Sequence, residues 1–237
     1  VRNPVLDLDR AINTIGLSAL VPLVVSFSMK GLVDAIGSPL NFEPFWKRSV
    51  LLSSVSVFLS LRAKNVSKEE ALLAGLLQDF GVLAAGAIHP EKYADLQEYF
   101  LEGHGCLVSM EKARFGSDHS LIGATLLRSW DFPPSLGNAV LYSHSLPDEK
   151  NRDLRWCVSG ANMIVSQITQ SLEEGDLWGD ICKSLSLPWL NLSISEIEPS
   201  ITEILHIVAE TASLFDVEVL PADVLETINT KDVMVSR

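Results

Sequence analysis

Cysteine is scarce in this sequence, and its spacing matches neither a disulfide framework nor a common zinc site. The chain of 237 residues has three cysteines, Cys106, Cys157 and Cys182, and no CxxC pair. An odd number of widely spaced cysteines favours free thiols over a set of disulfides. The zinc signature HExxH is absent as well. We therefore expect free thiols in a reducing, cytoplasmic environment.

Long apolar runs are also missing. The longest, "GLSALVPLVVSFSM" at residues 16–29, is interrupted by serines and by Pro22. It is shorter than the roughly 20 residues that a membrane span needs, so it predicts a buried helix and no membrane association. No N-terminal stretch has the basic-then-apolar build of a signal peptide. The first residue is Val, from which we expect a piece of a longer polypeptide.

Positive charge is in short supply, and most of the imbalance lies in one part of the chain. The net charge is −12, and residues 148–237 hold 16 acidic but only 6 basic side chains. Such a surface repels phosphate backbones, which argues against nucleic-acid binding. A solvated helical surface accounts for the acidic segment, and a basic protein partner is the alternative.

Motifs for nucleotide binding and for serine hydrolases are absent. The sequence has no GxGxxG, no GxxxxGK[ST] and no GxSxG. The three cysteines have no neighbours that would make a thiol nucleophilic. A nucleotide cofactor, a P-loop enzyme and a serine or thiol hydrolase therefore all lack support, and we expect no cofactor.

Helical periodicity is what the sequence has in abundance. Apolar residues recur at three- and four-residue spacing almost throughout, while alternating patterns are rare, so we predict an all-α protein. The polar break "LPDEKNRD" suggests a boundary near residue 149, between a core (1–149) and a helical extension with a tail (150–237). The predicted helices cover about 7–16, 17–36, 45–64, 67–79, 90–103, 105–114, 118–130, 135–145, 154–172, 176–185 and 195–215.

Two of the five histidines stand out as candidate metal ligands. His89, His104 and His206 are expected to be packed or surface residues, as most helical histidines are. His119 and His144 each lie near a predicted helix end and beside an apolar stripe. With Asp79 they would form a set of two imidazoles and one carboxylate, which can bind a first-row metal ion. Their spacing in the sequence does not show whether the three converge.

The order of four segments resembles the HDOD family, the HD-related output domains of bacterial signalling proteins. The resemblance covers about residues 5–148 and implies an HD-domain-like helical bundle, to which 150–237 adds a C-terminal helical extension. The family's first helices are expected to be missing before residue 1. The segments are "DLDRAINTIGLSAL" (7–20), "FWKRSVLLSSVSVFLS" (45–60), "ALLAGLLQDFGVLA" (71–84) and "EKARFGSDHSLIGATLLRSWDFPPSLGNAVLYSHS" (111–145).

The resemblance also indicates where catalytic HD-domain phosphohydrolases hold divalent metals. The first histidine of that site falls on Arg48, and the His-Asp pair falls on Gln78 and Asp79. The paired histidines of the cyclic-dinucleotide phosphodiesterases fall on Ser143 and His144, and the closing aspartate falls on Asn162. Four of these positions therefore lack the expected ligand. Since a guanidinium cannot bind a metal, we predict that Arg48 pairs with Asp79 instead.

These departures imply a non-catalytic regulatory module that acts through protein–protein contacts. The resemblance implies a bacterial two-component or cyclic-dinucleotide pathway, with a partner or fused effector of GGDEF, EAL, kinase or receiver type. A residual phosphohydrolase acting on a nucleotide or cyclic dinucleotide through Asp79, His119 and His144 is the alternative. A sensor that binds an anionic nucleotide through Arg48 is a third interpretation.

Overall fold

The computed structural model describes residues 43–96, 104–174, 182–183 and 185–219, together with Val24, Ser28 and Gly31. Every regular element among these residues is a helix, so the all-α prediction is confirmed for the described part of the chain. The predicted helices at 7–16 and 17–36, and most of the one at 176–185, lie outside the described residues, although Val24, Ser28 and Gly31 are helical.

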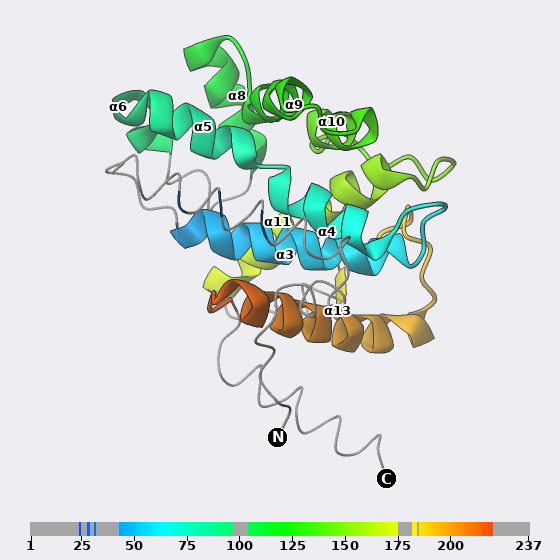
Figure 1. Cartoon of the computed structure of the whole chain (residues 1–237). Coiled ribbons are helices and arrows are strands. Elements are labelled where there is room, and N and C mark those ends of the chain that lie inside the picture. The colour runs from blue at the N-terminus through cyan, green and yellow to red at the C-terminus, as the bar shows by residue number, and fades with distance from the viewer. Residues whose placement is uncertain are drawn as a thin grey trace, which may run out of the picture.

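Figure 1 shows the helices and labels most of them. Their bounds are α3 (Glu43–Ser60), α4 (Lys68–Leu77), α5 (Phe80–Ile88), α6 (Pro90–Tyr93), the 3-10 helix η1 (Ala94–Leu96), α8 (His104–Phe115), α9 (His119–Ser129), α10 (Pro134–Leu141), α11 (Leu154–Glu174) and α13 (Ile194–Phe215).

The central element is α3, which is buried along most of its length. Figure 1 shows it between α13 on one side and α4 on the other, and α11 also packs on it. Gly75 of α4 allows close packing on α3, because a Cβ added to it would lie 2.5 Å from the Cα of Ser53. This close approach of α3 and α4 brings the residues of mid-α3 near the end of α4.

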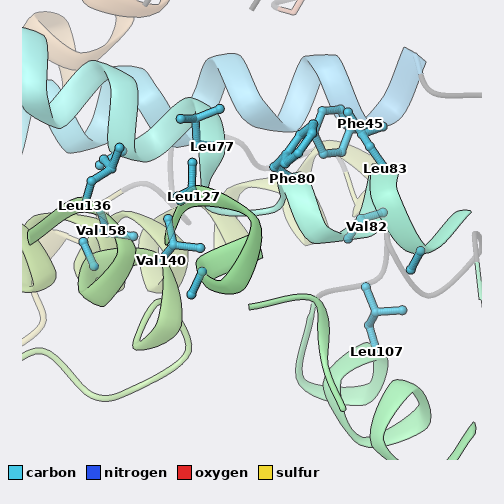
Figure 2. Packing of buried hydrophobic residues seen from close by; sticks show 14 of the residues in the cluster. Phe45, Leu77, Phe80, Val82, Leu83, Leu107, Leu127, Leu136, Val140 and Val158 are labelled. Carbon is cyan, nitrogen blue, oxygen red and sulfur yellow. The ribbon is translucent and has the colours of Figure 1, made fainter. Parts of the chain in front are cut away.

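Two apolar clusters hold the helices together. The first core lies between α4, α5, α9, α10 and the start of α11 (Figure 2). It includes Phe45, Leu77, Phe80, Leu83, Leu127, Leu136, Val140 and Val158. The second core lies between α3, α11 and α13 and includes Leu52, Phe58, Trp156, Ile164, Leu185 and Ile204. Buried apolar area of this kind supplies the main stabilisation of a helical domain.

Several helices end earlier than the sequence predicts. The helix expected at 45–64 ends at Ser60, and a turn follows in which Asn65 has a φ of 55°. The helix expected at 135–145 ends at Leu141. There the backbone N–H groups of Ser143 and Ser145 donate to the carbonyls three residues earlier, those of Val140 and Tyr142, and so form turns in place of the helix. The helix expected at 90–103 is a short α6 followed by η1, and 97–103 lies outside the described residues.

The helical extension packs directly on the rest of the molecule. Leu154 and Val158 of α11 belong to the first core, and Trp156 and Ile164 belong to the second. The last helix, α13, opens with a capping box formed by Ser193 and Glu196. The division of the chain at residue 149 stays a prediction.

One helical stretch is long and apolar enough to cross a membrane by length and composition alone. It is Lys68–Ile88, and 72% of its most apolar window is buried among the other helices. It comprises α4 and α5, which Gln78 and Asp79 separate. Core helices of this kind pass the same test, so the stretch is weak evidence for a span.

Candidate functional site

Polar side chains that are far apart in the sequence meet inside the molecule, between the first core and the second core. Several come from helix ends or the residues just beyond them, where side chains can point inward without interrupting a helix. The contributing residues are Arg48 of α3, Asp79 between α4 and α5, Glu111 of α8, His119 at the first position of α9, His144 after α10, and Asn162 and Ser166 of α11.

Arg48 and Asp79 form a buried ion pair, as the sequence predicts. Nε of Arg48 donates to Oδ2 of Asp79 at 3.1 Å, and the two side chains are 3% and 1% exposed. Burial lowers the pKa of Arg48, whereas the charge and the hydrogen bond of Asp79 raise it. A guanidinium stays protonated in proteins, so Arg48 places a permanent positive charge inside the site.

The same guanidinium also reaches α11. Its Nη2 group donates to Oδ1 of Asn162 at 2.8 Å and to the hydroxyl of Ser166 at 3.3 Å. One side chain therefore joins α3, the α4–α5 junction and α11. Asn162 is a position that the sequence analysis singled out; Ser166, one turn further along α11, is not.

His119 is held by Glu111 through both its backbone and its ring. Oε2 of Glu111 accepts from the backbone N–H of His119 at 2.9 Å and lies 2.6 Å from ring atom Nδ1. The hydroxyl of Tyr93 donates to the other oxygen, Oε1. Burial acts to lower the pKa of His119, but the hydrogen bond and charge of Glu111, with the charge of Asp79, raise it above 6.5.

Asp118 positions His119 by capping α9. Its Oδ1 accepts from the backbone N–H of Leu121 at 3.0 Å, and its Oδ2 lies 2.8 Å from Nζ of Lys112. Burial would raise the pKa of Asp118, but hydrogen bonds from Lys112, Ser120 and Leu121 lower it below the ordinary 3.8. Asp118, the first residue of the helix predicted at 118–130, is therefore the N-cap of α9.

A close crossing of α5 and α9 also brings His119 into the site. A Cβ added to Gly81 of α5 would lie 1.9 Å from the carbonyl oxygen of His119. A Cβ on Gly123 of α9 would in turn lie 3.3 Å from the backbone nitrogen of Gly81. These two glycines allow the backbones to approach to a distance that side chains would prevent, which places His119 beside Asp79.

The three candidate metal ligands converge. Nε2 of His119 lies 3.6 Å from Oδ1 of Asp79 and 2.7 Å from Nε2 of His144. The donor atoms of Asp79, His119 and His144 all lie within 4.8 Å of one another, which is close enough to hold a metal ion by distance. Asp79 and His119 are buried, and His144 is half-buried.

The charges around these donors fit a metal ion poorly. Oδ2 of Asp79 is already bound to the Arg48 cation. The guanidinium charge repels a dication bound beside it, while the Asp79 carboxylate, which would attract the dication, is shared with Arg48. At the other expected ligand positions, the Gln78 amide and the Ser143 hydroxyl are buried without hydrogen-bond partners among the described residues. The site thus combines a donor set that could hold a metal ion with an internal ion pair that uses one oxygen of Asp79.

Three residues of the site were missed by sequence reasoning. Glu111 begins the longest segment that resembles the HDOD family, so its presence there was a usable signal. Tyr93 and Ser166 reach the site only because α6 and α11 fold against it. No spacing in the sequence points to either of them.

The hollows beside α10 and α11 lie apart from these residues. One of about 660 Å³ is lined by Lys64, Asn138 and Arg155, among others, and one of about 170 Å³ by Leu146 and Ser159. Tyr142 borders both, and neither is lined by Arg48 or His119. These hollows therefore do not open onto the buried polar site.

Solved structures with the same fold come from bacterial proteins of low sequence identity. One, from Shewanella amazonensis SB2B and provisionally named a phosphohydrolase, is 21% identical, with a TM-score of 0.64 over 89% of this chain and 77% of that chain. The MmoQ response regulator of Methylococcus capsulatus str. Bath is 22% identical, with a TM-score of 0.54 over 85% of this chain and 78% of that one. At these identities the likeness concerns the fold alone.

A sequence relative is considerably longer than this chain. A protein of Treponema pallidum (strain Nichols), named only as uncharacterized, is 23% identical over 167 residues. The matched part is 68% of this chain but only 31% of that protein, so the chain spans less than a third of the relative's length.

The family is established by a direct match. The HDOD domain model matches residues 1–146, which is more than half of the chain. The matched range includes Arg48, Asp79, His119 and His144, and it ends before Asn162. The motifs quoted from the sequence are therefore those of the family they resemble, and this chain belongs to the HDOD domain family.

Proposed function

We propose that this chain is a non-catalytic signal-transduction module that acts through protein–protein contacts. The observation that carries the proposal is the buried Arg48 cation, which is bound to Asp79 at 3.1 Å and to Asn162 at 2.8 Å. Because this cation is held permanently beside Asp79, the charge of that carboxylate is neutralised within the protein and does not need a metal ion. Its role is then to fix the arrangement of the helices.

The setting of this module is proposed from the family. HDOD domains resemble output units, and a solved structure with this fold is named a response regulator. We expect a cytoplasmic bacterial protein of a two-component or cyclic-dinucleotide pathway. Its partner or fused effector would be of GGDEF, EAL, kinase or receiver type, and nucleic acid and membrane are not expected as partners.

Metal analysis combined with a hydrolysis assay tests this function. The purified protein is loaded with Mn²⁺, Fe²⁺ or Zn²⁺ in turn and desalted, and its metal content is then measured. Each sample is also incubated with cyclic di-nucleotides and nucleotide monoesters. We expect far less than one metal ion per chain and no turnover above a D79N control. A stoichiometric metal ion with turnover that D79N abolishes would refute the non-catalytic function.

A metal-dependent phosphohydrolase is the second candidate function. It is favoured by the convergence of Asp79, His119 and His144 within 4.8 Å and by the fold shared with the Shewanella protein. In that case H119A and H144A should each abolish both metal binding and turnover in the same assay. E203Q, a change on the surface of α13, serves as the matched variant that should leave both unchanged.

A nucleotide sensor that uses Arg48 is supported less well. The Arg48 side chain is only 3% exposed, and two of its three guanidinium nitrogens are bound to Asp79, Asn162 and Ser166. A phosphate group could reach it only if α11 moved away from α3. Binding of a nucleotide without turnover in the assay above would favour this alternative.

A further inference from the structure

Hydrogen bonds connect Arg48 to Glu111 through three side chains in an unbroken chain. The links join Arg48 to Asn162 (2.8 Å), Asn162 to His144 (3.1 Å), His144 to His119 (2.7 Å) and His119 to Glu111 (2.6 Å). Arg48 offers only donors, and the Glu111 carboxylate offers only acceptors. Because both ends are fixed, the donor and the acceptor of every link can be assigned.

Starting from Arg48, each side chain determines the next. Asn162 accepts from Arg48 through Oδ1, so its Nδ2 group donates to Nδ1 of His144. A neutral imidazole whose Nδ1 accepts carries its hydrogen on Nε2. That hydrogen points at Nε2 of His119, which accepts it, so the hydrogen of His119 lies on Nδ1 and faces Glu111. Starting from Glu111 leads to the same two tautomers.

A second hydrogen on the His119 ring would be incompatible with the assignment that starts from Arg48. His119 would then donate through Nε2, and His144 would have to accept there and carry its own hydrogen on Nδ1. That hydrogen would face the Nδ2 group of Asn162, which is itself a donor. A hydrogen atom nevertheless lies between the two Nε2 atoms in either state, because nitrogens 2.7 Å apart cannot both present lone pairs.

We infer that the hydrogen atom between Nε2 of His119 and Nε2 of His144 prevents the two nitrogens from both binding a metal ion. We also infer that Asn162 keeps this hydrogen in place by fixing the tautomer of His144. To bind a metal, both Nε2 atoms must present lone pairs; here one carries a hydrogen and the other receives it. Asn162 lies on α11, beyond the matched residues 1–146. The inference rests on the proposed metal-free function, for which it supplies a second cause besides the charge of Arg48.

Asn162→Asp is the single change expected to reverse the tautomer. A carboxylate at position 162 can still accept from Arg48, but toward Nδ1 of His144 it can only accept. His144 then carries its hydrogen on Nδ1, so a hydrogen between the two Nε2 atoms can come only from an added proton on His119. A cation beside Asp79 can replace that proton. We expect Asn162→Asp to bind Zn²⁺ about 10–100-fold more tightly than the natural protein, the range typical of changes to such supporting residues.

Ser166→Asp is the matched control for charge. Ser166 contacts the same Nη2 atom of Arg48 as Asn162 does, at 3.3 Å, and lies one turn further along α11. It makes no hydrogen bond to His144 among the described residues, so an aspartate there adds the same negative charge beside Arg48 without setting the tautomer. We expect Ser166→Asp to report the effect of charge alone and to raise Zn²⁺ affinity less than Asn162→Asp does.

Two measurements test the inference. Long-range ¹H–¹⁵N NMR of the natural protein assigns the ring tautomers, and titration calorimetry with Zn²⁺ alone compares it with the two variants after circular dichroism has checked their folding. We expect the Nε2–H tautomer for His144, the Nδ1–H tautomer for His119, and a larger gain in Zn²⁺ affinity in Asn162→Asp than in Ser166→Asp. The closing aspartate of HD phosphohydrolases falls at position 162, where a carboxylate can bind Zn²⁺ itself, so a gain in Asn162→Asp counts only together with the tautomers of the natural protein. If that variant is unfolded, these tautomers decide alone.

The outcomes separate this inference from the proposed function. A metal-free natural protein in which His144 carries its hydrogen on Nδ1 would overturn the inference and leave the non-catalytic function standing. Equal gains in Zn²⁺ affinity for Asn162→Asp and Ser166→Asp would also overturn it, since charge alone would then explain metal exclusion. A natural protein with a stoichiometric metal ion and turnover would overturn both.

Discussion

Replacing Arg48 with methionine should destabilise the protein more than the loss of any other single ion pair described for it. Methionine keeps most of the apolar length of the side chain and removes the charge. Asp79, which is 1% exposed, then loses its cationic partner, and Asn162 loses the donor at Oδ1. Breaking a buried pair in this way costs about 3–5 kcal/mol of unfolding free energy, because an uncompensated charge stays buried.

A second variant separates the cost of the orphaned charge from the loss of packing. In R48M/D79N neither side chain is charged, so the double variant should recover more than half of the stability that R48M loses. Urea denaturation at pH 7, followed by circular dichroism, gives both free energies. The recovery measures how much of the cost arises from Asp79 alone.

Arg62→Met is the control for removing an arginine from the same region of the chain. Arg62 lies just after α3 and pairs with Glu203 at 3.3 Å, but this pair is 25% and 39% exposed. Exposed pairs contribute about 1 kcal/mol or less. If R48M destabilises the protein no more than R62M does, Arg48 is not the buried counter-charge on which the proposed function depends.

Two further predictions concern the placement of His119. G81A should cost about 3 kcal/mol or more, because its Cβ would lie 1.9 Å from the His119 carbonyl oxygen; G137A, whose Cβ would meet its nearest atom only at 3.8 Å, should cost nothing measurable by the same denaturation. D118N should cost about 1 kcal/mol or less at pH 7, because asparagine can still cap α9 but loses the ion pair with Lys112. Since the pKa of Asp118 is lowered in the folded state, its contribution is present above pH 3.8 and is lost as the pH falls further, so the two proteins should converge in acid. A D118N deficit that persists undiminished below pH 3 would contradict this account of the cap.

Much of the site could be predicted because its residues are fixed by a local motif. Asp79 and His119 each lie at a helix boundary that the sequence marks, the first before Gly81 and the second after the Asp118 cap. The pairing of Arg48 with Asp79 follows from charge, because two such groups buried near one another stabilise each other. That these segments come together in space was predicted from the resemblance to the HDOD family.

The remaining features depend on contacts that no local pattern records. Ser166 and Tyr93 join the site from helices whose own sequences serve other packing roles. The early end of α10 at Leu141 depends on the tight turn that turns His144 toward His119. Helix ends of this kind are decided by a few hydrogen bonds of about 1 kcal/mol each, which periodicity does not detect.

The position of α11 bears on where this chain can be divided. The family match ends at residue 146, yet Trp156 of α11 is 1% exposed and packs against the second core, and Asn162 completes the hydrogen-bond chain. A fragment cut at that boundary would expose one side of α3 to water and leave Arg48 without two of its partners. Fusions or truncations that keep the module intact should therefore retain α11. This helix is packed into the domain and is not a linker that leads away from it.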